Sequence, residues 1–163
     1  MQETISVLTT GGTIDKIYFD ALSEFQVGEP QIGAFLREAN VRFSFSVRSL
    51  LRKDSLDLTD ADRDFISNEI ERETTRKILI THGTDTMLAT ALALQARVIE
   101  KTVVLTGAML PATQRGSDAV FNIGYAVGVL SVLPAGVYVA MNGQVFDPRY
   151  ARKNRANNRF EAV

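Results

Sequence analysis

Short apolar runs alternate along this chain with segments whose apolar residues recur at helical spacing. Four of the runs are predominantly apolar, as in buried strands, and cover residues 5–8, 77–80, 103–105 and 137–140. Residues 43–47 instead alternate between apolar and polar positions, the period of a strand with one buried face. Helical spacing is found between the strands, over residues 30–40, 59–70, 84–98 and 117–132. This alternation predicts an α/β fold in a single domain, with three layers (α/β/α), a mostly parallel sheet and right-handed crossovers.

Local signals refine the ends of these elements. Residues 15–30 lack a sustained period and contain Gly28 and Pro30, so we expect a long loop there. Loops of this length inside a compact domain often act as lids. Pro30 suits the first turn of the helix that follows it. Asp118 is expected in the first turn of the last helix, where its charge complements the helix dipole.

A threonine marks the start of the second helix. Thr59 is suited to cap that helix, although the third residue after it is Asp62 rather than the usual glutamate. The helix is then expected to turn Phe65, Ile66 and Ile70 toward the core.

The composition is ordinary and excludes several classes of protein. The chain has 163 residues, of which 45% are hydrophobic and 23% are charged, and this suits one soluble globular domain. A net charge of −1 gives no support for binding to nucleic acid or to an anionic membrane. The absence of cysteine excludes disulfides, thiolate metal sites and cysteine catalysis. The N-terminus lacks the basic region of a signal peptide, and no apolar run approaches the ~20 residues that span a bilayer. We therefore expect a cytoplasmic protein.

Two segments combine glycine with threonine where a predicted strand ends: TTGGTID at residues 9–15 and THGTDTM at residues 81–87. Ligands of open parallel sheets bind at the carboxyl ends of strands, so the two turns are expected to converge. Thr13 follows two glycines, so its hydroxyl can stand exposed while backbone amides such as that of Gly12 approach a substrate closely. To act as a nucleophile, a threonine needs an adjacent base and donors for the developing oxyanion.

Thr84 and Asp85 lie at the second junction between strand and helix. Asp85 is suited to hold a lysine or to bind a substrate ammonium group. Lys153, in the basic region near the C-terminus, is a candidate for that lysine. A lysine acts as a base only in its neutral form, which burial or a cationic neighbour favours. Arg152 and Arg155 flank Lys153 in the sequence and are candidates for that neighbour.

Each of these residues also has a structural interpretation. Thr13 is then a simple turn residue, Asp85 a residue of the first helical turn, and Lys153 a solvated cation. The only histidine, His82, is interpreted as a hydrogen-bonded structural residue, because no second histidine or acidic relay accompanies it. Phosphate binding has little support, since the full P-loop pattern and the GxGxxG fingerprint are both absent.

Taken together, the motifs resemble the bacterial-type L-asparaginases, a family of amidohydrolases with a threonine nucleophile. TGGTID at residues 10–15 looks like the first signature of that family, and THGTDTM at residues 81–87 looks like the second. Further matches are TGAMLP at residues 106–111, Phe121-Asn122 and Met141-Asn142. The resemblance covers nearly the whole chain but only the larger, N-terminal domain of the family. We therefore expect residues 1–163 to form one such domain, without the second, C-terminal domain.

The resemblance implies a reaction and the residues that carry it. Thr13 attacks the side-chain amide of L-asparagine, an acyl-enzyme forms as ammonia leaves, and water then releases L-aspartate. Thr84, Lys153 and Asp85 form a second group of hydroxyl, base and acid beside it. No metal or organic cofactor is expected.

Other matching residues are implied to bind the substrate. Ser55 matches a serine that binds the α-carboxylate, and Asp85 also contacts the α-amino group. Ala108 binds near the amide through its backbone. Gly12 and Thr84 complete the expected substrate-binding set.

Three departures from the family pattern change these expectations. The second domain normally completes the active site of a neighbouring subunit, so we expect a homo-oligomer, a dimer or tetramer, that completes its pocket another way. Leu56 follows Ser55 where a polar substrate-binding side chain is common, which predicts loose binding and a high KM. Phe25 occupies the position of the family's lid tyrosine, so Tyr18, five residues after Thr13, is expected to take its catalytic place.

Two other functions stay open at this stage. A degenerate family member would sense asparagine or another small amide without turnover, although binding alone does not require Thr13, Thr84, Asp85 and Lys153 together. An amidotransferase component that supplies ammonia would need a partner protein and a tunnel, which a sequence does not display.

Overall fold

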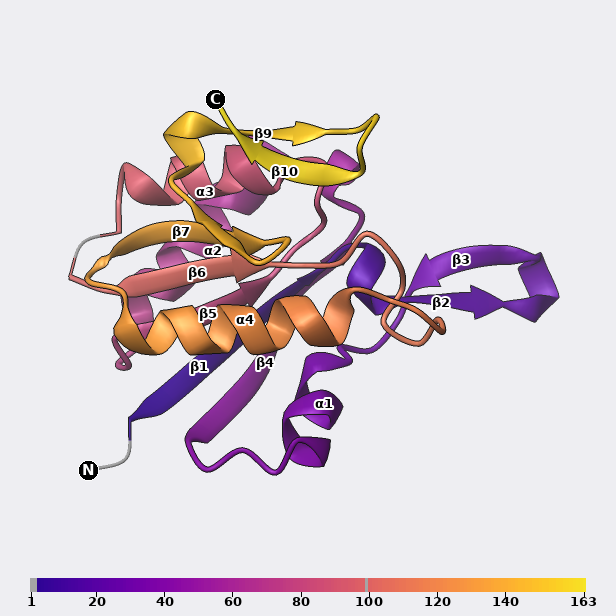
Figure 1. Cartoon of the computed structure of the whole chain (residues 1–163), viewed down its shortest axis with the longest axis horizontal. Helices are drawn as coiled ribbons and strands as arrows, with labels where there is room; N and C mark the ends of the chain where they lie inside the picture. The colour runs from indigo at the N-terminus through magenta and orange to yellow at the C-terminus, as the bar shows by residue number, and fades with distance from the viewer. Residues whose placement is uncertain (1–2, 99) are drawn as a thin grey trace.

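A six-stranded sheet forms the middle layer of the molecule, as the computed structural model in Figure 1 shows. The structure describes residues 3–98 and 100–163. The strand order is β4–β1–β5–β6–β7–β8, and neighbouring strands are parallel except β7 and β8. The strands are β1 (Thr4–Gly11), β4 (Ser44–Lys53), β5 (Lys77–Thr81), β6 (Thr102–Thr106), β7 (Gly136–Met141) and β8 (Gln144–Phe146).

Helices cover both faces of this sheet. Two of them, α2 (Asp60–Arg72) and α3 (Met87–Gln95), lie on one face, and α1 (Ile32–Glu38) and α4 (Ala119–Val132) lie on the other. Alternate residues of β5 enter the two cores, because Ile78 and Ile80 pack with α2 and α3 whereas Leu79 packs with α1 and α4. A strand buried on both faces needs a continuous apolar run, which is the pattern found there. The predicted three-layer α/β/α fold is confirmed.

Three of the helices, α1, α3 and α4, begin later than the sequence pattern indicated. The first residue of α3 is Met87, so Thr84 and Asp85 lie in the turn before the helix. Pro30 precedes α1, which begins at Ile32, and is not in the first turn. Asp118 stands just before α4, and its carboxylate accepts hydrogen bonds from backbone amides of the preceding loop. Its expected place in the first turn of a helix is therefore wrong.

The start of α2 follows the prediction, but one of its core residues does not. The Thr59 side chain accepts from the amide of Asp62, and the Asp62 carboxylate accepts from the amide of Thr59, so a shorter acid completes the capping box. Ile66 and Ile70 are fully buried. Phe65 is 40% exposed. Ile66 and Ile70, four residues apart, lie on the helix face that packs against the sheet, and Phe65 lies one position before that face.

Residues 15–30 do not form the expected structureless loop. β2 (Lys16–Phe19) and β3 (Glu24–Val27) pair as an antiparallel hairpin that projects from the body of the molecule (Figure 1). Consecutive apolar residues Ile17, Tyr18 and Phe19 are all exposed. A hairpin without a buried face shows no alternation of apolar and polar residues, and for this reason the sequence pattern missed it.

A second hairpin follows the main sheet, beyond residues 137–140, which are the last strand that the sequence pattern predicted. β9 (Ala151–Asn154) and β10 (Arg159–Ala162) form a separate two-stranded antiparallel sheet. Phe160 anchors it, because this ring is buried in the core that contains α2 and α3 and lies 6.3 Å from the ring of Phe146. Lys153 stands opposite Phe160 in the register of the hairpin. No helix within the described residues has the length and apolar character needed to cross a membrane.

Candidate active site

Three neighbouring parallel strands end at the same edge of the sheet. Thr9 of β1 is in register with Thr81 of β5, and Thr81 is in register with Thr106 of β6. The carboxyl ends of these strands are therefore level, which is where α/β proteins bind ligands. The turns that leave this edge carry Thr13, Thr84 and Ala108.

Glycines allow the turns to pack against one another. Gly12 has a φ of 86°, and a Cβ atom on it would lie 2.4 Å from the Cα atom of Gly83. A Cβ atom on Gly83 would in turn lie 2.5 Å from the Cβ atom of Ser55. The turns after β1 and β5 and the segment after β4 therefore form one closely packed row. This packing is possible because glycine, which has no side chain, occupies both positions.

The two threonines of the first signature have different environments. The Thr10 hydroxyl donates to the carbonyl of Thr81 at 2.9 Å and so ties β1 to β5. Thr13 begins the short 3₁₀ turn Thr13–Asp15 and is half-buried. Its hydroxyl has no hydrogen-bond partner within the part of the chain that the structure describes. Of the two, only Thr13 has a hydroxyl available for a substrate.

Lys153 connects the second signature to the C-terminal hairpin. Its Nζ atom donates to the Thr84 hydroxyl at 2.7 Å and to Asp85 Oδ1 at 2.9 Å, across 69 and 68 residues of sequence. Thr84 is buried, and the side chains of Lys153 and Asp85 are 16% and 24% exposed. The arrangement holds a hydroxyl, an amine and a carboxylate in direct contact, which is the set required to move a proton to or from a nucleophile. Arg155 Nη2 forms a second ion pair with the same Asp85 Oδ1, also at 2.9 Å.

Two asparagines hold the hairpin that carries Lys153. Asn122 of α4 donates to the carbonyl of Gly107 at 2.9 Å and accepts from the amide of Asn142 at 3.3 Å. The Asn142 side chain accepts from the amide of Phe160, opposite Lys153, at 2.8 Å. This chain of hydrogen bonds links the turn after β6 to the strand that faces Lys153. It runs beside Ala108, which is buried and follows Gly107 directly.

Ser55 lies where the segment after β4 meets the second signature. Its side-chain oxygen accepts from the amide of Thr86 at 3.3 Å, and its carbonyl accepts from the Thr86 hydroxyl at 2.7 Å. Asp54, just before it, is paired with Lys16 at 2.6 Å. The Lys16 ammonium lowers the pKa of the Asp54 carboxyl, and the charge of Lys153 adds to this effect. The Ser55 segment and Lys153 therefore belong to one electrostatic neighbourhood. Leu56, the next residue, is exposed.

Asp15 closes the base of the projecting hairpin. Its carbonyl accepts from the amide of Gly28 at 2.8 Å, and its carboxylate accepts from the amide of Gln31 at 2.9 Å. Both bonds fix the segment that leaves β3. Burial of the carboxylate raises its pKa to about 6, which the bond from Gln31 only partly offsets.

His82 is a structural residue, and that interpretation is confirmed. It is completely buried, with Nδ1 2.7 Å from the carbonyl of Gly83 and Nε2 2.8 Å from the Thr90 hydroxyl. A carbonyl can only accept, so Nδ1 carries the proton and Nε2 accepts from Thr90, whose oxygen accepts from Arg63 at 3.3 Å. Burial lowers the pKa of His82 to about 4. The neutral ring fixes the carbonyl of Gly83, the residue before Thr84.

Tyr18 lies on the hairpin, away from the row of turns. Its side chain is directly opposite Phe25 in the pairing of β2 and β3, and the two rings meet edge to face at 5.4 Å. Tyr18 is 52% exposed. Among the described residues it has no hydrogen bond to Thr13, Thr84 or Lys153. The tyrosine and the phenylalanine thus occupy the same rung of the hairpin.

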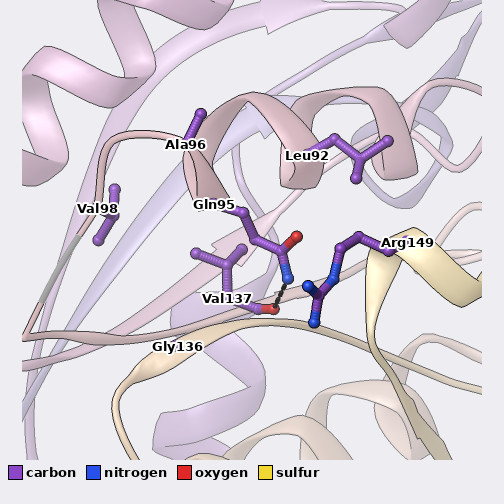
Figure 2. A pocket seen from close by; sticks show the side chains of 7 residues that line it. All are labelled: Leu92, Gln95, Ala96, Val98, Gly136, Val137 and Arg149. Atoms are coloured by element: carbon purple, nitrogen blue, oxygen red, sulfur yellow. Dashed lines mark hydrogen bonds between the residues drawn. The ribbon is translucent and has the colours of Figure 1, made fainter.

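A separate open hollow of about 520 Å³ lies at the opposite end of the sheet (Figure 2). It is lined by the end of α3 and the start of β7, with Gln95 and Arg149 as its polar groups. The Gln95 amide donates to the carbonyl of Val137 at 3.3 Å, and Arg149 is paired with Asp147 at 2.6 Å. Both polar groups are already partnered, so this hollow offers no free chemical group. In the described residues, no three acidic or histidine side chains are grouped to hold a metal ion.

Several residues of the site carry no signal that reasoning from the sequence used. Asn122 and Asn142 stood out only as family matches, and the contacts that give them a purpose cross from α4 to β10. Arg155 was considered only as a cation that flanks Lys153 in the sequence, and not as a partner of Asp85. Lys16 and Asp15 were assigned to a loop.

Comparison with known proteins identifies relatives for nearly the whole chain. Residues 4–162 match the family described as "Asparaginase, N-terminal". The "Probable L-asparaginase periplasmic" of Haemophilus influenzae is 33% identical over 159 residues, which cover 91% of this chain and 46% of that protein. The chain thus spans about half the length of this relative.

Solved structures agree with the sequence match. L-asparaginase I from Vibrio cholerae superposes with a TM-score of 0.85 at 27% identity, over 99% of this chain and 52% of that one. A probable cytoplasmic L-asparaginase from Campylobacter jejuni superposes with a TM-score of 0.78 at 30% identity, again over 99% and 52%. With the family match extending over residues 4–162 and the same fold in both structures, this protein belongs to the asparaginase family and corresponds to its N-terminal domain.

Proposed function

We propose that this protein is an amidohydrolase that converts L-asparagine to L-aspartate and ammonia. One observation carries the proposal: Lys153 Nζ contacts both the Thr84 hydroxyl and the Asp85 carboxylate at the sheet edge where Thr13 has a free hydroxyl. A turn with no chemical task does not require a lysine from a separate hairpin in such contact. Membership of the asparaginase family supports the same reaction.

In the proposed reaction, Thr13 is the nucleophile. Its oxygen bonds to the side-chain carbonyl carbon of asparagine, the carbon–nitrogen bond breaks, and ammonia leaves with the proton that the hydroxyl gave up. Water then adds to the resulting ester, aspartate leaves, and the Thr13 hydroxyl is restored. Thr84, Lys153 and Asp85 relay protons in both steps. Tyr18 takes the catalytic place of the family's lid tyrosine beside Thr13 when the hairpin closes over the site. Its position opposite Phe25, which occupies the lid-tyrosine position in the sequence, supports this assignment.

Binding of the substrate follows from the same edge of the sheet. Ser55 is proposed to hold the α-carboxylate, and Asp85 and Thr84 the α-amino end. The backbones of Gly12 and Ala108 lie on the two strand-end turns that flank the turn after β5, and are proposed to contact the amide. Nothing in this scheme requires a cofactor or a metal ion.

We propose weak binding, with a high KM. Leu56 is 64% exposed next to Ser55, so it adds an apolar side chain where a polar contact to the amino acid would be useful. A KM in the low micromolar range would contradict this part of the proposal.

A homo-oligomer, a dimer or a tetramer, is also proposed. The β2–β3 hairpin has a cluster of exposed apolar side chains, and such clusters are typical of protein–protein contact surfaces. They are Ile17, Tyr18, Phe19, Leu22 and Phe25. Light scattering at micromolar concentration tests this, and a monomer mass would remove it. A cytoplasmic location stays a prediction, because one similar structure is titled cytoplasmic and one relative is named periplasmic.

The test is release of ammonia from L-asparagine, with L-glutamine in parallel, from micromolar to tens of millimolar substrate. Thr13→Ala and Lys153→Met are expected to abolish turnover while the protein stays folded. The matched controls are Thr4→Ala, at the exposed start of β1, the strand that leads to Thr13, and Arg152→Met, next to Lys153 on β9; both are expected to keep activity. Saturable binding of asparagine without any turnover by the parent would favour a sensor of small amides instead.

A further inference from the structure

Arg155 occupies the carboxylate that the proposed function assigns to the substrate ammonium. Its Nη2 atom lies 2.9 Å from Asp85 Oδ1, the same oxygen that accepts from Lys153 at 2.9 Å. Both cations come from the C-terminal hairpin and its turn, two positions apart along the chain. One carboxylate oxygen therefore already serves two positive charges.

The geometry leaves limited capacity for a third cation. Asp85 Oδ1 accepts a hydrogen bond from Lys153 and also lies in an ion pair with Arg155. Oδ2 accepts no hydrogen bond from the described residues, so an α-ammonium group must either take Oδ2 beside two like charges or displace a cation. Lys153 is held in addition by Thr84 at 2.7 Å, which leaves Arg155 as the group that can yield.

The charges around the site add to this effect. Lys16, Lys153 and Arg155 face only two carboxylates, those of Asp54 and Asp85, in this cluster of ion pairs. The excess positive charge favours an anionic ligand and opposes a cationic group. The Arg155 side chain is 69% exposed, so its ion pair is weak enough for a ligand to displace at modest cost.

We propose that Arg155 is a specificity-determining residue that competes with a substrate α-ammonium for Asp85. The site then discriminates against free amino acids in favour of small amides that carry a carboxylate but lack the ammonium group, such as succinamate, which is asparagine without that group. This inference rests on the proposed function, because it takes Asp85 as the contact of the α-amino group.

The test compares two ligands that differ only in that group. Binding of L-asparagine and of succinamate is measured by calorimetry in a Thr13→Ala background, which prevents turnover, with Arg155 intact or changed to alanine. Loss of Arg155 is expected to tighten asparagine about two- to fivefold, the range of an exposed ion pair, and to leave succinamate unchanged or weaker. Arg155→Lys is expected to restore most of the parent ratio. Arg152→Ala removes an exposed arginine of the same hairpin, paired with Glu161, and is expected to change neither ligand.

The outcomes separate the inference from the proposed function. If Arg155→Ala weakens asparagine binding, or shifts both ligands by the same factor, the competition is overturned while the amidohydrolase proposal stands. If neither ligand binds to any variant and the parent releases no ammonia, the proposed function fails and takes this inference with it. The ratio of kcat/KM for the two amides, measured with Thr13 present, must move in the same direction as the ratio of affinities.

Discussion

The backbones of Gly12 and Gly83 touch, to the extent that a Cβ atom on Gly12 would lie 2.4 Å from both the Cα and the amide nitrogen of Gly83. The first residue precedes Thr13 and the second precedes Thr84. Contact between the two glycines therefore sets the spacing between the two threonine turns without any direct bond between the threonines. Gly83 is in turn wedged against Ser55, so the spacing extends to the segment after β4.

Alanine at either glycine is expected to destabilise the protein. Gly12→Ala and Gly83→Ala should each lower the free energy of unfolding by about 2 to 3 kcal/mol, because the added methyl group meets backbone or a buried side chain. Gly124→Ala and Gly128→Ala are matched controls, since α4 offers open space at both positions. They should gain about 0.5 to 1 kcal/mol through helix propensity. Urea denaturation decides, and equal effects at all four sites would contradict the packing described.

Asp15 should make the protein less stable as the pH rises. Its pKa is raised from 3.8 to about 6 in the folded state, so between these values the folded state holds the extra proton. The free energy of unfolding should therefore fall by about 3 kcal/mol in all between roughly pH 3 and pH 7 on account of this group, about two-thirds of it from pH 4 to pH 6. Asp15→Asn, whose amide oxygen can accept from Gln31, should be more stable than the parent at pH 7. Asp20→Asn, an exposed acid of the same hairpin, should change little.

His82 should make the protein more stable as the pH rises, which is opposite to the effect of Asp15. Its pKa is lowered from 6.5 to about 4, so its contribution is complete above pH 6.5 and is lost as the pH falls toward 4, about 3 kcal/mol in all. On acidification over nearly the same range, the contribution of Asp15 to stability rises while that of His82 falls. The free energy of unfolding of the parent should therefore change little with pH there. Asp15→Asn should then lose stability steeply on acidification from pH 6.5 to 4.5, while His82→Asn should gain it. A steep profile in the parent, unchanged by Asp15→Asn, would argue against this balance.

Asn142 should control activity through the position of Lys153. Asn142 has a φ of 54°, so glycine keeps its backbone and removes only the side chain that accepts from Phe160. Asn142→Gly should lower kcat for ammonia release about tenfold, as expected when a catalytic group is misplaced slightly. Asn158→Gly, also at a positive φ of 50° but in the exposed turn between β9 and β10, is the control and should keep kcat. Similar losses in both variants would point to a general loosening of the hairpin.

The β2–β3 hairpin should become harder to cleave when ligand is bound. Tyr18, Phe19 and Phe25 are exposed sites for chymotrypsin, and closure of the hairpin over the site would shield them. Saturating L-aspartate should slow cleavage within residues 16–27 several-fold, as followed by mass spectrometry. Cleavage after Tyr150, which is 60% exposed outside the hairpin, serves as the internal reference. Equal rates within the hairpin with and without aspartate would remove the lid from the mechanism.

The central layers could be predicted because burial imposes a pattern on them. Ile78, Leu79 and Ile80 are apolar without interruption since both faces of β5 are covered, and a short run of this kind between turn residues is typical of a buried strand. The two hairpins could not be predicted in this way. β2 has no buried face, and β9 and β10 are rich in arginine and asparagine, with Phe160 as the one buried aromatic ring.

The candidate site likewise combines residues that local sequence predicts with residues that it does not. Thr13 and Thr84 could be placed from local sequence, because strand ends and glycines indicate where a turn reaches the carboxyl edge of a parallel sheet. Lys153 could be named as a candidate partner of Asp85 and matched to the family, but nothing near it in the sequence indicates contact with a residue almost 70 positions earlier. The ion pair between Arg155 and Asp85 depends on the path of the turn after β9, which charge counting does not give.

The β9–β10 hairpin pairs with no strand of the main sheet, and this separation has a consequence for the response of the protein to heat. Its ties to the body include the Phe160 ring, the packing of Ala151, the Asn142 bond and the contacts of Lys153 and Arg155. A unit with so few ties opens at a lower free energy than the sheet unfolds. On warming, Lys153 would thus leave the edge of the sheet while the sheet and its helices stay folded. The protein would lose activity reversibly at a temperature below that of global unfolding.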